Sequence, residues 1–163
     1  MEYFLGLGSN LGRRSANLSR ARRLLEKGGL EVVNASSIYE TEPVDLPDQP
    51  LFLNQVLEVR TALDPPALLR LAKSVEASLK RVPTVSMGPR TIDVDILLAG
   101  DAVLETPDLV VPHPRLHLRN FVLVPLAEIA AGARHPVLGK TVRELAAASL
   151  DRARVVKLCR RRR

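Results

Sequence analysis

The sequence of 163 residues contains no tryptophan and one cysteine, and aromatic side chains make up 3% of it. A lone cysteine, Cys159, cannot form a disulfide within the chain, so no disulfide framework is expected. No apolar run approaches the roughly 20 residues of a membrane-spanning helix. RNA-binding strand motifs stack bases on aromatic side chains, and this sequence has few of them. These absences favour a soluble cytoplasmic protein without a membrane partner.

The net charge of +6 arises from the C-terminal end. Residues 151–163 hold seven of the 24 basic residues and one of the 18 acidic residues, so residues 1–150 are neutral overall. A nucleic-acid-binding protein typically carries a basic patch on its folded body, and no specific nucleic-acid partner is therefore expected. The length suits one hydrophobic core. We interpret residues 1–159 as a single domain and residues 160–163 as a basic tail.

The most informative stretch, residues 87–100, reads Met-Gly-Pro-Arg-Thr-Ile-Asp-Val-Asp-Ile-Leu-Leu-Ala-Gly. β-Branched and aliphatic residues between a Gly-Pro pair and a Gly-Asp turn predict a strand over 91–98. Side chains two apart on a strand point to the same face, so Asp93 and Asp95 are expected side by side. Two such carboxylates require a cation between them, and Mg²⁺ is the simplest candidate because it prefers oxygen ligands.

Further candidate binding residues accompany this acidic pair. Arg90 is placed to take a pair of phosphate oxygens through its planar guanidinium. On a predicted strand over 51–61, Phe52 and Asn54 share a face and together suit a flat, hydrogen-bonding heterocycle. His113, held between two prolines, suits a phosphate or nucleotide contact. From the residues alone, a solvated acidic strand, a core phenylalanine and a structural histidine remain open alternatives.

The periodic segments predict an α+β fold. Strands are expected over 2–7, 30–39, 51–61 and 91–98, and helices around 18–25 and 65–79. Their order, βαββαβ, is that of a ferredoxin-like fold, whose sheet is mainly antiparallel and carries both helices on one face. Thr141 and Glu144 predict a capping box for one additional C-terminal helix to about Leu150. Residues 153–158 are expected to add an edge strand.

The segment 88–97 closely resembles the signature of the 6-hydroxymethyl-7,8-dihydropterin pyrophosphokinase family, which serves folate biosynthesis. The resemblance covers most of the chain, because further motifs follow in the family's order: Gly8-Ser9-Asn10-Leu11-Gly12, Phe52-Leu53-Asn54, Val111-Pro112-His113 and Arg119-Asn120-Phe121. It implies transfer of pyrophosphate from ATP to the pterin hydroxymethyl group, with two Mg²⁺ ions as cofactors. The products would be AMP and the pterin diphosphate, and a monomer is expected.

The resemblance also assigns roles to individual residues. The implied metal ligands are Asp93 and Asp95, and the implied catalytic residues are these two acids with Arg81 and Arg90. The implied ATP contacts are Glu76, Arg81, Arg90, His113 and Arg119. The implied pterin contacts are Thr41, Val44, Phe52, Asn54, Asp95 and Phe121. The turn at 8–12 is expected to support the substrate site.

Residues 81–87 align with a loop that closes over ATP in the family. Here Arg81 remains basic, but Met87 takes the place of the usual tryptophan and the loop has fewer cations. This departure bears on loop closure more than on the reaction. Two other functions fit parts of the pattern: a Mg²⁺-dependent nucleotidyltransferase using the same acidic pair, which would release free pyrophosphate, and a ferredoxin-like RNA-binding module using the basic tail.

Overall fold

The computed structural model describes residues 1–44, 46–79 and 88–159. Within them, the main strands span Glu2–Ser9 (β1), Glu31–Ala35 (β2), Tyr39–Thr41 (β3), Phe52–Arg60 (β4), Asp93–Leu98 (β5) and Val155–Lys157 (β8). They form one antiparallel sheet in the order β5-β1-β4-β3-β8, and β2 also pairs with β4. The long strands β1 and β4 pair along their whole length, from Glu2 opposite Arg60 to Ser9 opposite Leu53.

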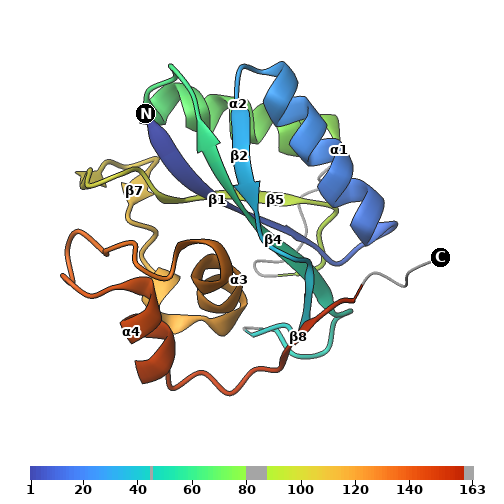
Figure 1. Cartoon of the computed structure of the whole chain (residues 1–163). Helices are drawn as coiled ribbons and strands as arrows, with labels where there is room; N and C mark the ends of the chain where they lie inside the picture. Colours follow the sequence, from blue (N-terminus) through green and yellow to red (C-terminus); the bar gives the residue numbers. More distant parts are fainter. Residues whose placement is uncertain (45, 80–87, 160–163) are drawn as a thin grey trace.

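Helices cover both faces of this sheet (Figure 1). The helices span Arg14–Lys27 (α1), Pro65–Ser78 (α2), Asn120–Ala130 (α3) and Val142–Ala148 (α4). α1 and α2 lie on one face, and α3 and α4 lie on the other. Each face has its own hydrophobic core: Val94 and Ile96 of β5 belong to the core with α1 and α2, whereas Leu97 belongs to the core with α3 and α4.

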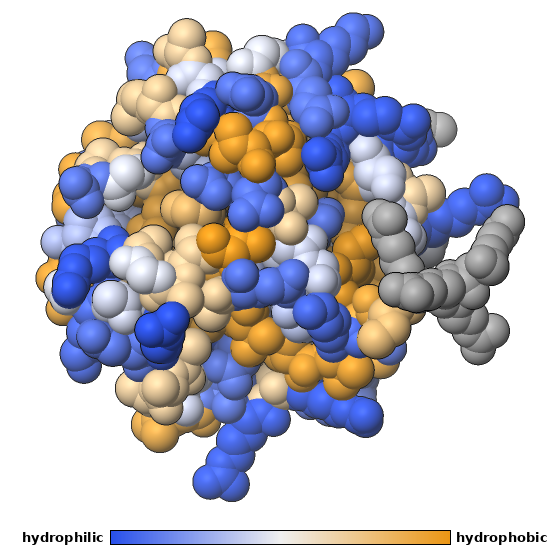
Figure 2. Space-filling model, in the orientation of Figure 1, coloured by the Kyte–Doolittle hydropathy of each residue, from blue (hydrophilic) through white to orange (hydrophobic). Residues whose placement is uncertain are grey.

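The outer surface mixes apolar and charged residues, as the face in Figure 2 shows. Among the described residues, no helix is both long and apolar enough to cross a membrane.

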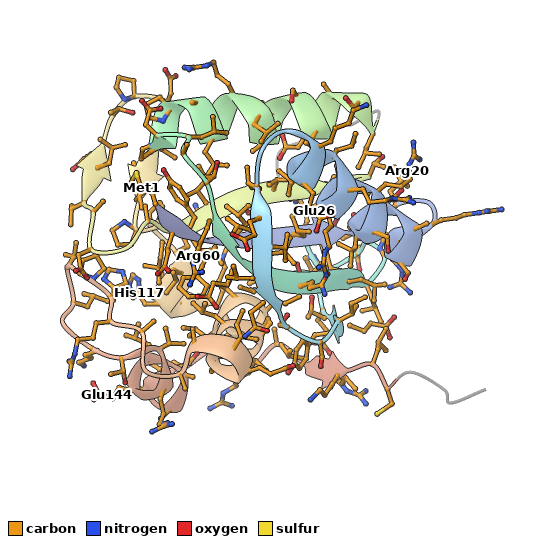
Figure 3. The ribbon with its side chains drawn as sticks, turned by 45° about the horizontal axis from the view of Figure 1, so that its top comes forward. Met1, Arg20, Glu26, Arg60, His117 and Glu144 are labelled. Carbon is orange, nitrogen blue, oxygen red and sulfur yellow. The ribbon has the colours of Figure 1, made fainter. Side chains whose placement is uncertain are left out.

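α1 and α2 form because the sequence carries their signals locally. Leu18 and Leu25 are buried against the sheet, whereas Arg20 points away from it (Figure 3). α1 ends at a glycine pair, which is a common helix stop. At the start of α2, the Asp64 carboxylate accepts a hydrogen bond from the Ala67 N–H at 2.9 Å, and two prolines occupy the first turn. Both predicted helices are confirmed.

Residues 30–39, predicted as one strand, form two. β2 ends at Ala35 and β3 begins at Tyr39, and both strands pair with β4. At the break, the Ser36 hydroxyl accepts a hydrogen bond from the Val56 N–H at 2.9 Å, in place of a strand carbonyl. The single-strand prediction is wrong because a side-chain hydroxyl can replace a ladder hydrogen bond without changing the hydrophobic pattern.

The C-terminal part contains α3 and α4, although the sequence predicts one helix there. α4 is the predicted one, and the capping box of Thr141 and Glu144 is present. α3 was missed because Pro125 lies inside it, which normally argues against a helix interior. A short hairpin of β6 (Leu104–Glu105) and β7 (Val110–Val111) and a 3₁₀ helix at Leu116–Leu118 precede α3. The predicted ferredoxin-like order and the edge strand, β8, are confirmed.

Candidate active site

A pocket opens between β1, β4 and β5 on one side and the start of α3 on the other. It holds about 720 Å³ of empty space, part of it open to solvent, which suits a small-molecule site. Nine of the predicted site residues line it: Thr41, Val44, Phe52, Asn54, Arg90, Asp93, Asp95, Arg119 and Phe121. Residues from six separate elements or loops thus meet at one place.

Asn54 and Thr41 give the pocket a buried polar wall. The Asn54 Nδ2 donates a hydrogen bond to the Thr41 Oγ1 at 2.7 Å, and both residues are buried. Gly8 lies opposite Asn54 on β1, where an added Cβ would stand 2.7 Å from the Asn54 Oδ1. Any side chain at position 8 would therefore displace this amide. The amide retains a second N–H and its oxygen for a ligand.

Asp93 and Asp95 both line the pocket from β5, as their spacing predicts. In the sheet register they lie opposite Gly8 and Gly6 of β1, and these glycines leave the face beside the acids open. The Arg90 Nη1 lies 2.6 Å from the Asp93 Oδ2, and the two side chains are 18% and 17% exposed. Arg90 thus places a positive charge beside Asp93. This charge offsets the repulsion between the Asp93 and Asp95 carboxylates.

The acidic pair fits magnesium rather than a closed metal cage. Within the part of the chain that the structure describes, there is no cluster of three or more His, Cys, Asp or Glu side chains that could hold a metal. Mg²⁺ commonly takes one or two protein carboxylates and completes its shell with water and substrate phosphates. Asp93 and Asp95, beside an open pocket, match that donor set.

Phe52 and Phe121 line the pocket from different elements, β4 and α3. An arginine guanidinium group lies over each ring. The Arg90 Cζ lies 5.3 Å from the Phe52 centroid, and the Arg119 Cζ lies 5.7 Å from the Phe121 centroid. Both distances are those of cation–π contacts. The pocket therefore offers two aromatic surfaces to a flat ligand, with a positive charge beside each.

Asn10 connects two loops that border the pocket. Its Nδ2 donates to the Gln49 Oε1 at 2.9 Å and to the Pro50 carbonyl at 3.1 Å. Its Oδ1 accepts a hydrogen bond from the Arg90 N–H at 2.8 Å, and the residue is 2% exposed. A buried amide bonded on both sides holds its partners rigidly. These contacts agree with the expected supporting role of the turn at 8–12.

Glu76 does not line the pocket. Its Oε1 accepts a hydrogen bond from the Val94 N–H at 2.9 Å, which ties α2 to β5. Arg81, the loop 81–87 and the tail 160–163 lie outside the described residues. The ATP contacts expected of Glu76 and Arg81 stay predictions.

His113 also lies outside the pocket lining. Its backbone N–H donates to the Leu97 carbonyl at 2.9 Å. Its ring Nδ1 accepts a hydrogen bond from the backbone N–H of Arg115 at 3.2 Å. Burial and the nearby Arg119 and Arg115 lower the pKa of His113. The imidazole is therefore neutral at physiological pH, which suits a hydrogen bond to a nucleotide better than a charge contact. Its predicted role remains a prediction.

The pocket also contains residues that sequence reasoning missed: Pro43, Gln49 and Gln55. Pro43 and Gln55 are direct neighbours of the predicted residues Val44 and Asn54, so adjacency was the available signal. Gln49 had no local signal, because its partner Asn10 lies 39 positions away.

An acidic pair on a strand, two arginines and an adjoining pocket are groups of the kinds that phosphoryl-transfer enzymes use. The fold and the site define this class.

Within that class, the chain belongs to the 7,8-dihydro-6-hydroxymethylpterin-pyrophosphokinase family, which its residues 4–131 match. It is 48% identical over 127 residues to the 2-amino-4-hydroxy-6-hydroxymethyldihydropteridine pyrophosphokinase of Bacillus subtilis, covering 77% of this chain and 76% of the relative. The protein of the same name from Aquifex aeolicus is 42% identical over 141 residues, which are 86% of this chain and 88% of the relative. The predicted family and enzyme type, an ATP-dependent diphosphokinase of folate biosynthesis, are confirmed.

The same region occurs within longer proteins. The mitochondrial folate synthesis bifunctional protein of Arabidopsis thaliana is 41% identical over 132 residues, which are 81% of this chain but 24% of that protein. Among solved structures, the wild-type HPPK-DHPS of Plasmodium falciparum with pteroate has a TM-score of 0.71 and 18% identity. That likeness covers 90% of this chain and 42% of the other, and it supports the fold.

Proposed function

We propose that this pocket is where pyrophosphate passes from ATP to the hydroxymethyl oxygen of 6-hydroxymethyl-7,8-dihydropterin, giving AMP and the pterin diphosphate. One observation carries the proposal: the acidic pair and the implied pterin contacts meet in a single pocket. Those contacts are Thr41, Val44, Phe52, Asn54, Asp95 and Phe121. They come from β3 and the loop after it, from β4, from β5 and from α3, so adjacency in the sequence does not explain their meeting.

The aromatic and amide residues suit the pterin. A pterin ring is flat, with hydrogen-bond donors and acceptors along its edges. Phe52 and Phe121 offer faces on which it can stack, and the Asn54 amide offers both a donor and an acceptor. The Thr41 hydroxyl fixes that amide, so the pterin would meet an oriented partner.

Asp93 and Asp95 would hold two Mg²⁺ ions, which supply positive charge to the triphosphate and orientation to the reacting hydroxyl. An Asp93 carboxylate that binds Mg²⁺ would no longer need the ion pair with Arg90 to offset its charge. The Arg90 guanidinium would then turn from the Asp93 Oδ2 to phosphate oxygens, which it can bind in bidentate fashion.

In the reaction, the hydroxymethyl oxygen attacks the β-phosphorus of ATP and loses its proton. The bond between the β-phosphorus and the oxygen bridging to the α-phosphorus breaks, and AMP leaves. Catalysis of this kind is largely positioning and charge stabilisation. Arg90 and Arg119, both at the pocket, would stabilise the charge that develops on the transferred group and on AMP.

Product analysis with ATP, Mg²⁺ and the reduced pterin tests the proposal. We expect AMP and the pterin diphosphate in equal amounts, without free pyrophosphate. Asp95→Asn should abolish product formation, whereas Asp101→Asn, at an exposed acid in the turn after the same strand, should leave the rate unchanged. Free pyrophosphate together with a nucleotide joined to the acceptor would instead indicate a nucleotidyltransferase.

We further propose that residues 1–159 form one domain that works as a cytoplasmic monomer without a specific nucleic-acid partner. Cys159 is a free, exposed thiol, which suits a reducing compartment. Light scattering on active enzyme checks the oligomeric state, and a dimeric mass would contradict this part of the proposal.

A further inference from the structure

The C-terminal strap, defined as residues 149–158, lies beyond the residues 4–131 that match the family. It runs from α4 to the edge of the sheet (Figure 1). At that edge β8 pairs with β3, and Val155 stands opposite Thr41, which lines the pocket. The strap therefore lies outside the range that matches the family and reaches β3, which carries a proposed pterin contact.

Within the strap, Asp151 holds the first residue of α3. Its Oδ2 accepts a hydrogen bond from the Asn120 N–H at 2.8 Å, and its carbonyl oxygen accepts one from the Asn120 Nδ2 at 3.0 Å. The N-cap residue of α3, Arg119, makes no side-chain cap hydrogen bond. The first N–H groups of a helix need acceptors from outside the helix. Asp151, 31 positions away, supplies one.

This contact lies next to two pocket residues. Asn120 is flanked by Arg119 and Phe121, which both line the pocket. Asp151 is itself restrained, because its Oδ1 accepts a hydrogen bond from the Ala153 N–H at 2.9 Å. A carboxylate bonded through both oxygens can fix where the first turn of α3 begins, and with it the positions of the two flanking side chains.

The other end of the strap holds the opposite wall of the pocket. The Glu42 N–H donates to the Arg154 carbonyl at 3.1 Å, and the Arg154 N–H donates to the Glu42 Oε2 at 3.1 Å. Glu42 lines the pocket next to Thr41. The strap thus joins α3 to the edge of β3 by hydrogen bonds at both ends.

We propose that Asp151 is a positioning residue of the pterin site, which sets Arg119 and Phe121 by bonding the start of α3. The inference rests on the proposed function, in which Phe121 contacts the pterin. Displacing a binding group by a fraction of an ångström is costly, so Asp151→Ala should raise the pterin Kd and KM by about tenfold. The turnover number should fall by less than this, because Asp93, Asp95 and Arg90 are untouched and only the contribution of Arg119 is disturbed.

Calorimetric titration of the pterin, with steady-state kinetics and thermal melts, tests this on the full chain. Asp151→Asn retains one acceptor oxygen for the Asn120 N–H but loses the acceptor for the Ala153 N–H, so it should bind within about threefold of wild type, a smaller loss than that of Asp151→Ala. Asp64→Ala is the matched control, because it removes the cap carboxylate of α2 on the other face of the sheet. Both alanine variants should lower Tm, and Asp151→Ala alone should lose pterin affinity.

A double-mutant cycle checks the route of the effect. In a Phe121→Ala background, Asp151→Ala should weaken pterin binding by less than about twofold, because the residue it positions is gone. Full additivity, or wild-type affinity in Asp151→Ala, would overturn the proposal, as would an equal loss in Asp64→Ala. A wild-type protein that does not bind the pterin would overturn the proposed function instead.

A milder variant decides the matter if Asp151→Ala does not fold. Asn120→Ala removes the hydrogen bond to the Asp151 carbonyl and leaves the bond to the carboxylate. We expect an affinity loss of about threefold, in proportion to one lost hydrogen bond. Unchanged pterin affinity in this variant would contradict the proposal.

Discussion

The two faces of the sheet are held together in different ways. On the face with α1 and α2, the start of α2 depends on a near neighbour, because Asp64 bonds the N–H three positions away. On the other face, α4 is also capped locally, but the partners of α3 are distant: Asn120 is bonded from 31 positions away, and Glu128 bonds Tyr39 from 89 positions away. The pocket lies on this second face, against the start of α3.

This difference separates stability from function. A defect on the α1 and α2 face should weaken the fold and leave the pocket in place when the chain is folded. A defect on the α3 face should do both, because α3 carries Arg119 and Phe121 into the pocket. The acidic pair lies on the same face of β5 as Leu97, which belongs to the core with α3. Its place is set by the pairing of β5 with β1, so loss of a charge there should affect the reaction more than the fold.

The largest expected effect comes from that acidic pair. Asp95→Ala, and likewise Asp93→Ala, removes a proposed metal ligand, and turnover should fall by about 10³-fold, the scale of losing one essential transition-state group. For Asp95→Ala, stability should stay the same or rise, because one of two like charges is gone. Asp93→Ala also breaks the ion pair with Arg90, so its Tm should fall slightly. Steady-state kinetics and a thermal melt measure both. Wild-type turnover would remove the acid from the site, and a large drop in Tm would make it structural.

A matched pair of core leucines tests the comparison directly. Leu68 of α2 and Leu123 of α3 are both fully buried, on opposite faces of the sheet. Each change to alanine should cost about 2 to 5 kcal/mol in the free energy of unfolding. Only Leu123→Ala should also weaken pterin binding, measured by calorimetry under conditions where both variants are folded. Equal pterin affinity in the two variants would mean that α3 is positioned independently of its core.

The elements that depend on local contacts could be predicted from the sequence, and those that depend on distant contacts could not. β1, α1, β4, α2 and β5 were predictable because their caps, stops and periodicity lie within the segment itself. The break between β2 and β3 was not, since it depends on the Ser36 hydroxyl meeting the Val56 N–H. α3 could not be predicted either, because Pro125 lies inside it and because the acceptor for its first N–H comes from the distant Asp151.

The site residues could be predicted where the two-residue period of a strand or a family motif identified them. The spacing of two placed Asp93 with Asp95 and Phe52 with Asn54, and the pocket contains all four. Arg119 and Phe121 entered through the family resemblance, although their element was not recognised as a helix. Gln49 could not be found, because its place depends on an amide contact between distant loops.

The next effect in size concerns the aromatic wall. Phe121→Ala should weaken pterin binding by about 1 to 3 kcal/mol through lost stacking and apolar contact. Phe4→Ala is the control, since Phe4 packs against the core on the α3 side but does not line the pocket. Calorimetry with the pterin distinguishes them. If both variants lose affinity equally, the loss reflects general loosening of this face rather than a contact from Phe121.

The smallest expected effect concerns how α3 is tied to the sheet edge. The Glu128 carboxylate accepts hydrogen bonds from the Tyr39 hydroxyl and from the Ser37 N–H and hydroxyl, and the Lys157 Nζ lies 3.9 Å away. Burial alone would raise the pKa of Glu128, but these bonds and Lys157 together lower it below its usual value of 4.5. Burial and the contact with Glu128 raise the pKa of Tyr39 to about 12, so the phenol stays a donor throughout the acid range.

The sign of the pH dependence follows from the lowered pKa. The unfolded chain takes up the Glu128 proton more readily than the folded chain, so the stabilisation is present above pH 4.5 and is lost as pH falls through the folded pKa. Glu128→Gln keeps an acceptor oxygen but no charge. Its free energy of unfolding should lie below that of wild type by about 1 kcal/mol at neutral pH, which is roughly the difference between a hydrogen bond to a charged acceptor and one to a neutral acceptor.

Urea unfolding at a series of pH values measures this difference, which should shrink toward zero as the solution is made more acidic. Glu144→Gln, at the exposed cap of α4 (Figure 3), is the matched control. Because it leaves Glu128 intact, its free energy of unfolding should follow that of wild type. The difference between Glu144→Gln and Glu128→Gln should therefore also shrink toward zero at low pH. A difference that stays constant across the acid range would show that charge at Glu128 does not hold α3. Packing would then tie the pocket-bearing helix to the sheet, as it does α1 and α2 on the opposite face.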